Sequence, residues 1–330
     1  MKVSIIVPVY NGGAAFRRCL GRILAAQPPA DEVIVVDDAS TDDSARVAEE
    51  YRVRLIRRDT KGGPAAARND GARAASGDVL FFVDADVGIH PDAVGRVREV
   101  LGNELDVAAV FGSYDDEPSE KNFLSQYKNL FHHFIHQTSA TEVSTFWAGC
   151  GAIRKTAFEA MGGFDAQRYP QPSIEDIELG QRLRRAGYRI RLDPQLQGKH
   201  FKRWGVRSLW RADFFQRALP WSQLILERGW FQPDLNLQLR HRVSVALVWL
   251  LPVALVITRL SPWLWLGVST TMSALVLING DVYAFFSRKR GVGFMLRAII
   301  CHWLYYGYCG LAYAWKWLEF QQRRFHPARP

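Results

Sequence analysis

The stretch VLFFVDAD, residues 79–86, sets the expectation for the fold. Its first five residues are an unbroken apolar run, typical of a parallel strand that is buried on both faces. Similar short apolar runs occur before and after it, and segments with the apolar spacing of helices separate them. This alternation predicts an α/β fold with a mostly parallel sheet. The other expected strands are residues 3–9, 33–36, 53–56 and 107–111.

Two acidic clusters directly follow expected strands. Asp84-Ala85-Asp86 follows the strand at 79–83, and Asp37-Asp38 follows the strand at 33–36. Because ligands of such sheets bind at the carboxyl ends of the strands, we expect one shared site. For Asp37 and Asp38 a second interpretation is compatible with the first, namely that they cap the next helix together with Ser40.

The spacing of Asp84 and Asp86 suits a divalent cation. Two carboxylates separated by one residue can reach one hard cation or its waters, and that cation can neutralise a diphosphate leaving group. Acidic pairs at strand ends are also common without a metal. The motif by itself therefore leaves both interpretations open.

Six motifs resemble the family 2 glycosyltransferases in their order and spacing. They are SIIVPVYN (4–11), VVDDASTD (35–42), RN (68–69), GD (77–78), FVDAD (82–86) and ED (175–176). The resemblance covers residues 1–200, which we expect to be the catalytic domain. It implies a GT-A fold, which is Rossmann-like with a mostly parallel sheet. It also implies an inverting reaction, Mg²⁺ or Mn²⁺ as the cofactor, and a nucleotide-diphosphate sugar as the donor, with a UDP-sugar as the first expectation.

The resemblance also implies which residues bind the donor. Three residues at the end of the first strand would line the nucleotide pocket, and one of the paired aspartates would bind the base or ribose. Arg68 would approach the diphosphate, although a surface salt bridge explains it equally well. Asp84 and Asp86 would hold the metal and the ribose. The donor-binding set is Pro8, Tyr10, Asn11, Asp37, Asp38, Arg68, Asp84, Ala85 and Asp86.

Asp176 is the expected general base, with Glu175 beside it. An acceptor hydroxyl must lose a proton as it attacks the anomeric carbon, and a positioned carboxylate can accept that proton. The alternative is that both acids only favour the N-terminus of their helix through its dipole.

Residues 113–145 read as polar and irregular.

The stretch WAGCG (147–151) is the expected acceptor-side loop, with Trp147, Gly149, Cys150 and Gly151 as its site residues. Small residues would let the backbone approach a sugar, on which Trp147 would stack. A tryptophan of the core is the alternative.

The stretch HFKRW (200–204) follows the last expected strand of the catalytic domain. His200 would complete the metal or diphosphate site when a flexible segment closes over the donor, whereas the alternative is a structural histidine. Lys202, Arg203 and Trp204 would lie at the diphosphate. Processive polysaccharide synthases of the resembled family carry Q-x-x-R-W later in the chain. Because histidine replaces glutamine here and little membrane sequence follows, we favour transfer of a single sugar.

The C-terminal part has the composition of a membrane protein. Residues 201–240 form a basic amphipathic segment, expected to lie in the membrane interface, and residues 241–330 form the expected membrane domain. Spans are expected at 243–260 and 262–280, and a third at 293–318 either crosses or lies in the interface. Basic residues flank the first two spans, so their hairpin tip should face outwards. The net charge of +9 therefore favours anionic lipid over nucleic acid as the partner.

These observations together predict an integral protein of the inner membrane with a cytoplasmic catalytic domain. The run at 3–9 is too short for a signal peptide. The expected reaction moves one sugar to a lipid-linked acceptor, such as a polyprenyl phosphate, a polyprenyl-diphosphate glycan or a glycolipid. Two alternatives remain, a processive polysaccharide synthase and a non-catalytic, membrane-tethered protein that binds nucleotide sugars.

Overall fold

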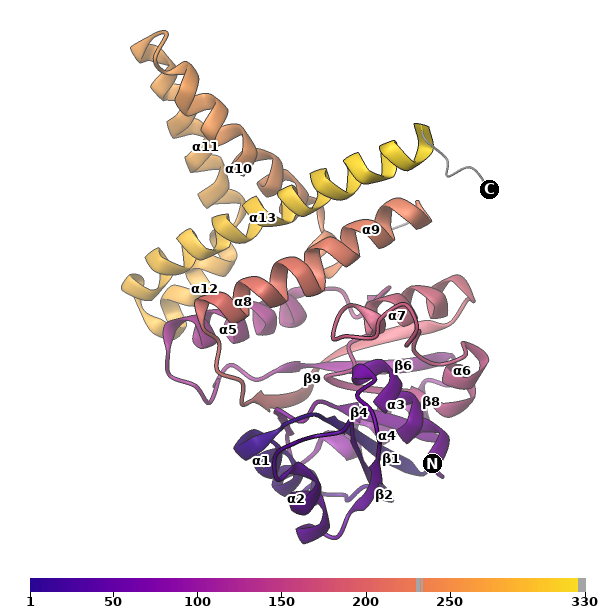
Figure 1. Cartoon of the computed structure of the whole chain (residues 1–330). Coiled ribbons are helices and arrows are strands. Elements are labelled where there is room, and N and C mark those ends of the chain that lie inside the picture. Colours follow the sequence, from indigo (N-terminus) through magenta and orange to yellow (C-terminus); the bar gives the residue numbers. More distant parts are fainter. Residues whose placement is uncertain (230–231, 233, 326–330) are drawn as a thin grey trace. The chain divides into compact units, whose positions relative to one another are not determined.

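The computed structural model describes residues 1–229, 232 and 234–325, and its contacts divide the chain into two compact units (Figure 1). The first unit is Met1–Trp204, and the second begins at Gly205.

A nine-stranded sheet forms the centre of the first unit. The strand order is β3-β2-β1-β4-β8-β6-β9-β5, and β7 pairs with β9. The first four strands in this order are parallel, as predicted, whereas β8 is antiparallel to both of its neighbours. The bounds are β1 Val3–Val9, β2 Glu32–Asp37, β3 Arg54–Arg57, β4 Val79–Val83, β5 Val87–Ile89, β6 Val107–Tyr114, β7 Glu142–Val143, β8 Cys150–Arg154 and β9 Arg189–His200.

The helices of the first unit pack on the sheet through their apolar faces. In α1 the buried residues Phe16, Cys19, Leu20 and Ile23 recur every three or four positions. In α3, Gly71 lets the helix approach β1 closely, since a Cβ atom there would lie 2.4 Å from a methyl group of Ile6. The helices are α1 Gly13–Leu24, α2 Ser44–Glu50, α3 Gly63–Ala74, α4 Ala93–Asn103, α5 Phe123–Thr138, α6 Lys155–Ala160 and α7 Glu175–Arg185.

The region read as polar and irregular contains α5, a regular helix of 16 residues. Three of its polar side chains bond to backbone carbonyl groups of β6 and of the residue that follows it. The Nδ1 atoms of His133 and His136 lie 2.7 and 2.8 Å from the carbonyl oxygens of Tyr114 and Gly112, and Asn129 donates to the carbonyl of Asp115 at 2.6 Å. The pairing of β6 with β9 shifts register between Phe111 and Ser113, where the carbonyl of Gly112 bonds to the His136 side chain instead.

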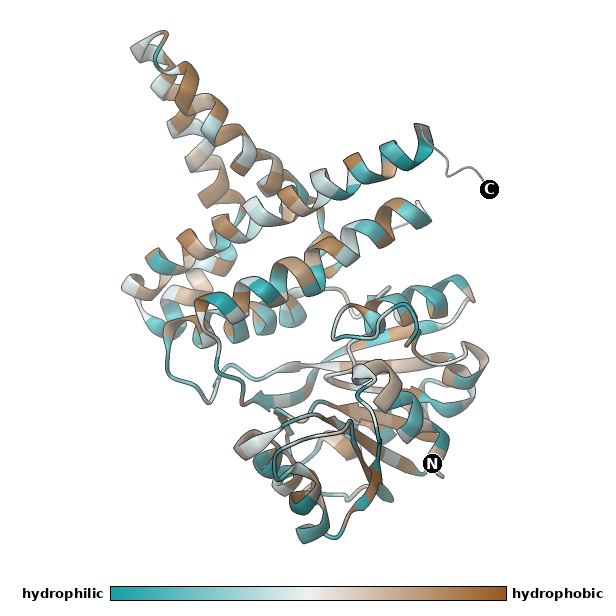
Figure 2. Cartoon of the chain, viewed as in Figure 1, coloured by the Kyte–Doolittle hydropathy of each residue, from teal (hydrophilic) through white to brown (hydrophobic). Residues whose placement is uncertain are grey.

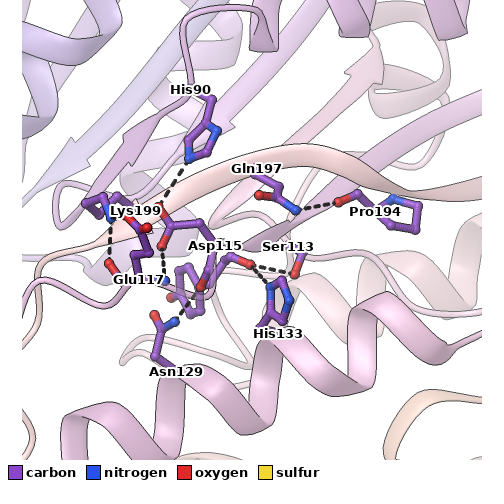
Figure 3. A network of polar contacts seen from close by, with 10 residues as sticks. His90, Ser113, Asp115, Glu117, Asn129, His133, Pro194, Gln197 and Lys199 are labelled. Atoms are coloured by element: carbon purple, nitrogen blue, oxygen red, sulfur yellow. Dashed lines mark hydrogen bonds and ion pairs between the residues drawn. The ribbon is translucent and has the colours of Figure 1, made fainter. Parts of the chain in front are cut away.

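A buried carboxylate follows the end of β6. Figure 3 shows His90 and Lys199 directed at Asp115, whose Oδ2 atom lies 3.2 Å from His90 Nε2 and 3.0 Å from Lys199 Nζ. These contacts tie the end of β6 to β9 and to the residue after β5, next to the strand pairing that places His200.

The second unit consists of helices. A continuous rod comprises α8 Val206–Trp210, the π-helical segment η1 Arg211–Ala218 and α9 Leu219–Arg228. The long α13 lies beside this rod (Figure 1), and Tyr308 on α13 donates a hydrogen bond to Asp213 at 2.8 Å. The remaining elements are η2 Leu235–Leu237, α10 Leu239–Ile257, η3 Pro262–Leu264, α11 Trp265–Ile278, α12 Gly280–Arg290 and α13 Val292–Phe325.

Among the described residues, α10 is the one helix that is long and apolar enough to cross a membrane, and 17% of its most apolar window is buried. With α11 it forms a hairpin whose residues are largely hydrophobic (Figure 2). One apolar helix is weak evidence for a membrane protein. The predicted first span, 243–260, corresponds to α10, which begins and ends a few residues earlier.

The predicted second span, 262–280, is not one helix. It is divided between η3, the 14 residues of α11 and the first residue of α12. At 1.5 Å per residue, α11 is shorter than the hydrocarbon core of a bilayer. The helix ends at Asn279, which donates hydrogen bonds to Ser244 and to the carbonyl of Leu275. The predicted third span lies within α13, a helix of 34 residues that carries Arg297, His302 and Lys316.

Candidate functional site

The predicted site residues of the first unit gather at the carboxyl ends of β1, β2 and β4 and at the start of α7. Asp84 follows β4 directly, and its backbone N–H donates to the carbonyl of Gly149 at 3.1 Å. The D-x-D turn closes where the N–H of Val87 donates to the carbonyl of Asp84 at 2.9 Å. This turn reverses the chain from β4 into β5, which places Asp86 beside β9.

Asp86 lies next to His200 and Lys202. Its Oδ2 atom is 3.8 Å from His200 Nε2 and 3.9 Å from Lys202 Nζ. The backbone fixes this arrangement, because Val87 pairs with His200 and the N–H of Phe201 donates to the carbonyl of Asp86 at 2.8 Å. Burial raises the pKa of Asp86, but the neighbouring His200 and the charge of Lys202 outweigh burial and bring it to about 2.

His200 lies in a buried position at the end of a strand. It is the last residue of β9, is 5% exposed, and stacks on Tyr114 with ring centroids 4.2 Å apart. Strand pairing places His200 beside the D-x-D motif, and its part in completing a metal or diphosphate site stays a prediction.

Arg68 joins two acidic positions that are 91 residues apart in the chain. One guanidinium nitrogen, Nη2, lies 2.7 Å from Asp84 Oδ1, and the other, Nη1, lies 2.8 Å from Glu175 Oε1. Arg68 is 5% exposed. The alternative of an exposed surface salt bridge is therefore wrong, and the bridge is a buried one.

Asp176 begins α7 together with Glu175. Its Oδ2 atom accepts a hydrogen bond from the backbone N–H of Ala148 at 3.1 Å, and its Oδ1 atom accepts one from the N–H of Ile177 at 2.8 Å. Burial and the charge of Glu175 raise the pKa of Asp176 to about 6, against the opposing charge of Arg68. A carboxylate with this pKa is suited to accept a proton near neutral pH. Both acids also lie in the first turn of the helix, where its dipole favours them.

Asp37 and Asp38 are buried in local hydrogen bonds. Both oxygens of Asp38 accept from the first turn of α3, with the N–H groups of Gly62 and Gly63 at 2.8 Å, and Arg58 Nε lies 2.9 Å away. Asp37 accepts from the N–H of Ser40 at 3.0 Å. The pair does not cap the next helix, α2, whose N-cap is Asp43, so that interpretation is wrong; Asp38 instead ties the end of β2 to α3. A donor-binding role for either aspartate stays a prediction.

The predicted donor-binding residues at the end of β1 differ in their surroundings: Asn11 holds a neighbouring loop, whereas Tyr10 is exposed. Asn11 accepts from the N–H groups of Thr41 and Asp42 at 2.8 and 3.3 Å, which holds the loop after β2. Tyr10 is 43% exposed, and the ammonium of Lys61 lies 3.5 Å from its ring centroid. Pro8 is half-buried in β1.

The glycines of the WAGCG loop make room for its own tryptophan. A Cβ atom on Gly149 would lie 2.6 Å from the ring of Trp147, and one on Gly151 would lie 2.3 Å from its carbonyl oxygen. Trp147 itself is half-buried against Tyr114 and His132, with ring centroids 4.9 and 4.7 Å away. The close packing explains the small residues without a sugar.

Four other predicted residues have the following surroundings, and their roles in the site stay predictions. Cys150 begins β8 and is buried, and burial raises the pKa of its thiol. Arg203 is 75% exposed along its side chain, with Nη1 at 3.5 Å from Glu120. Trp204 is buried and its backbone N–H donates to the hydroxyl of Ser125 at 2.7 Å. Ala85 lies half-buried between the two aspartates.

The predicted metal ligands do not form a complete metal site. In the part of the chain that the structure describes, no group of three or more histidine, cysteine, aspartate or glutamate side chains is arranged to hold a metal. The physical reason is that Arg68 occupies Asp84 Oδ1, while His200 and Lys202 lie beside Asp86. Carboxylate oxygens and an imidazole nitrogen are nevertheless ligands that Mn²⁺ accepts.

Two features at the site were missed in the sequence. Lys61 lies over Tyr10, and Tyr114 stacks on His200. Neither belongs to one of the six motifs, and both meet their partners across the fold rather than along the chain. Tyr114 lies beyond the expected strand at 107–111, so no local signal identified it.

Comparison with known proteins agrees with this geometry. Residues 4–162 match the model of the family described as Glycosyl transferase family 2. The chain is 36% identical over 113 residues to the uncharacterized glycosyltransferase YibD of Escherichia coli, and 37% identical over 113 residues to a dolichol-phosphate mannosyltransferase of Pyrococcus furiosus. These matches cover 32% and 33% of this chain and 33% and 32% of the two relatives. The chain therefore spans about a third of the length of each relative.

A solved structure has the same fold. The mannosyltransferase PcManGT from Pyrobaculum calidifontis, in complex with GDP-Man and Mn²⁺, superposes with a TM-score of 0.60 at 18% identity. The match covers 95% of this chain and 87% of PcManGT. At this identity the likeness concerns the fold alone, and it confirms the predicted GT-A fold.

Proposed function

Because residues 4–162 are a glycosyl transferase family 2 domain, we propose that the protein is an inverting glycosyltransferase that uses a nucleotide-diphosphate sugar. The observation that carries the proposal is the convergence of two acidic positions on one buried arginine. Asp84 from the D-x-D motif and Glu175, next to Asp176, both contact Arg68. A donor at Asp84 and a base at Asp176 would therefore face one reaction centre.

The donor would bind along the ends of β1 and β4. Asp84, Asp86 and His200 are the residues available to hold Mn²⁺ or Mg²⁺, with the donor diphosphate supplying further ligands. When bound, the cation would neutralise charge on the leaving nucleoside diphosphate. Lys202, with its ammonium 3.9 Å from Asp86, would add a second positive charge there. Tyr10 would offer its exposed ring to the base.

Asp176 would act on the acceptor. Its carboxylate is held by the N–H of Ala148, which follows Trp147, so the base lies beside the predicted acceptor loop. It would remove the proton from an acceptor hydroxyl as that oxygen attacks the anomeric carbon from the face opposite the diphosphate. This single displacement inverts the anomeric centre. The raised pKa of Asp176 favours a hydroxyl acceptor, since a phosphate acceptor is already ionised and needs no base.

A lipid-linked acceptor at the cytoplasmic face of the membrane is the second half of the proposal. It is supported by the exposed apolar side chains of the α10–α11 hairpin and by the arginines along α8 and η1. One relative carries the name dolichol-phosphate mannosyltransferase. A hydroxyl on a polyprenyl-linked glycan or a glycolipid fits both the base and the hairpin.

The test is donor consumption by the full-length protein in detergent. A panel of UDP- and GDP-sugars with Mn²⁺ is incubated with lipid-linked acceptors, and nucleoside diphosphate release is measured. We expect one donor to be consumed in an acceptor-dependent and Mn²⁺-dependent way, with one sugar added per acceptor. A polymeric product would indicate a processive synthase. Donor binding without consumption, with every acceptor tried, would support the non-catalytic alternative.

A further inference from the structure

Arg68 is placed as a structural tie rather than as a ligand. Both outer nitrogens of its guanidinium face carboxylates, at 2.7 Å from Asp84 and 2.8 Å from Glu175. The ring of Phe164 lies 5.6 Å from its central carbon. With the side chain 6% exposed, the guanidinium presents little surface to a diphosphate.

The helix that carries Arg68 is itself anchored on the acceptor side. The neighbouring Asn69 clasps the backbone of Phe164, donating to its carbonyl at 2.8 Å and accepting from its N–H at 2.9 Å. These two hydrogen bonds hold α3 against the segment between α6 and α7. The backbone that carries Arg68 is therefore held in place where its side chain reaches Glu175.

We propose that Arg68 is a positioning residue that couples the donor carboxylate Asp84 to the acceptor-side acids Glu175 and Asp176. The proposal rests on the glycosyltransferase function argued above. Arg68 sets the separation between the two halves of the reaction centre, because its planar fork spans two carboxylates from different elements. A lysine offers one point charge and cannot hold both in this geometry.

The electrostatics of the cluster support the coupling. Two adjacent acids at the start of α7 repel each other, and the ion pair with Arg68 compensates the charge of Glu175. Burial and the charge of Glu175 raise the pKa of Asp176, and the charge of Arg68 lowers it. Arg68 thus affects the base without touching it.

A double-mutant cycle tests the coupling. Arg68→Lys, Glu175→Gln and the double variant are compared in kcat, in donor KM, and in the affinity for Mn²⁺ with nucleoside diphosphate. We expect Arg68→Lys to lower kcat at least tenfold with donor affinity within threefold of wild type. The double variant should lose no more activity than the less active of the two single variants, because both substitutions break the same set of contacts. Arg96→Lys, which alters the bridge to Asp193 on β9, is the matched control and should retain activity.

Three outcomes would overturn the proposal. The first is a large loss of affinity for nucleoside diphosphate with kcat retained, which would make Arg68 a diphosphate ligand. The second is additive loss in the double variant. The third is an Arg68→Lys protein as active as wild type.

A thermal-unfolding cycle on the same variants keeps the test independent of turnover. We expect Arg68→Lys and Glu175→Gln each to lower the Tm, and the double variant to lower it by less than their sum. If the wild-type protein consumed no nucleotide sugar, the proposed function would fail, while this unfolding cycle would still report whether the tie exists. Additive Tm losses would argue against the tie whatever the activity.

Discussion

The backbone N–H of Ala148 donates a hydrogen bond to Oδ2 of Asp176 across 3.1 Å. This contact joins the N-terminus of α7 to the loop that carries Trp147. A carboxylate held by backbone groups at both oxygens has a fixed orientation, which a general base requires. The contact therefore places the predicted base and the predicted acceptor loop in one rigid arrangement.

Replacing the base should stop transfer without preventing donor binding. Asp176→Asn keeps the size of the side chain and an oxygen that can accept from Ala148, but it removes the proton acceptor. We expect the rate of transfer to fall by about 10²–10⁴-fold, the typical contribution of a general base, while the donor affinity measured by calorimetry stays near wild type. Asp106→Asn, at an exposed carboxylate paired with Arg189, is the control and should be fully active. Near-normal transfer by Asp176→Asn would refute the assignment of the base.

The rate should fall on the acid side of about pH 6. The pKa of Asp176 is raised to about 6, so the carboxylate is ionised and able to accept a proton above that pH and is protonated below it. We expect kcat/KM to rise about tenfold per pH unit below pH 6 and to level off above it, because kcat/KM reports the ionisation of the enzyme without bound substrate. A profile that stays flat down to pH 4.5 would mean that Asp176 titrates normally or takes no part in the reaction.

The strands could be predicted from the sequence, but their partners only in part. The runs at 3–9, 33–36, 79–83 and 107–111 are strands because an unbroken β-branched or aromatic run fits a sheet covered on both faces. The insertion of β8 between β4 and β6 had no local signal, since the same residues could pair at either edge. Helix α5 was missed because its histidines and Asn129 look like loop residues until the carbonyls of β6 are known.

The candidate site, too, could be predicted from the sequence only in part. Motif spacing located Asp84, Asp86 and Asp176, because strand ends and helix starts are local features. It could not show that Arg68 contacts Glu175, since the two lie 107 residues apart in the chain and meet through tertiary packing. For the same reason the sequence suggested a sugar-facing role for Gly149, whose space is filled by Trp147.

Asp176→Asn should also stabilise the folded protein at neutral pH. A carboxyl group whose pKa is raised on folding opposes folding once it ionises, so stability is lost as the pH rises through the range from its unfolded value of 3.8 to about 6. An asparagine carries no charge to bury. We expect the Tm of Asp176→Asn to exceed that of wild type at pH 7.5, and the difference to shrink at pH 5, where Asp176 is largely protonated. A lower Tm at pH 7.5 would show that the hydrogen bond from Ala148 outweighs the buried charge.

His200 should govern the metal requirement. Its Nε2 atom lies 3.8 Å from Asp86 and is held there by the pairing of β5 with β9. We expect chelation by EDTA to abolish transfer and excess Mn²⁺ to restore it. In His200→Ala we expect the Mn²⁺ concentration for half-maximal activity to rise by about tenfold or more. His90→Gln is the control, because His90 pairs with Asp115 instead. An unchanged Mn²⁺ dependence in His200→Ala would leave this histidine a purely structural role.

The exposed apolar face of α10 should hold the protein at a membrane. Val253 and Val256 lie within this helix and are 56% and 71% exposed, which is unfavourable in water and favourable in a bilayer. We expect the wild-type protein to float with liposomes and to resist extraction by carbonate. A lysine in the apolar part of a spanning helix costs about 2.5–3.5 kcal/mol, so Val253→Lys with Val256→Lys should release much of the protein.

The control must carry a lysine at an equally exposed apolar residue of the first unit. Leu105, between α4 and β6, is 81% exposed, and Leu105→Lys should float like wild type. Circular dichroism and the Tm of each variant separate release from unfolding. If the Val253→Lys, Val256→Lys protein were folded and still floated fully, then α10 would not be what anchors the chain. The arginine-rich rod of α8, η1 and α9 would then be the next segment to test, and high salt should release a protein bound in that way, because interfacial charge attraction is screened.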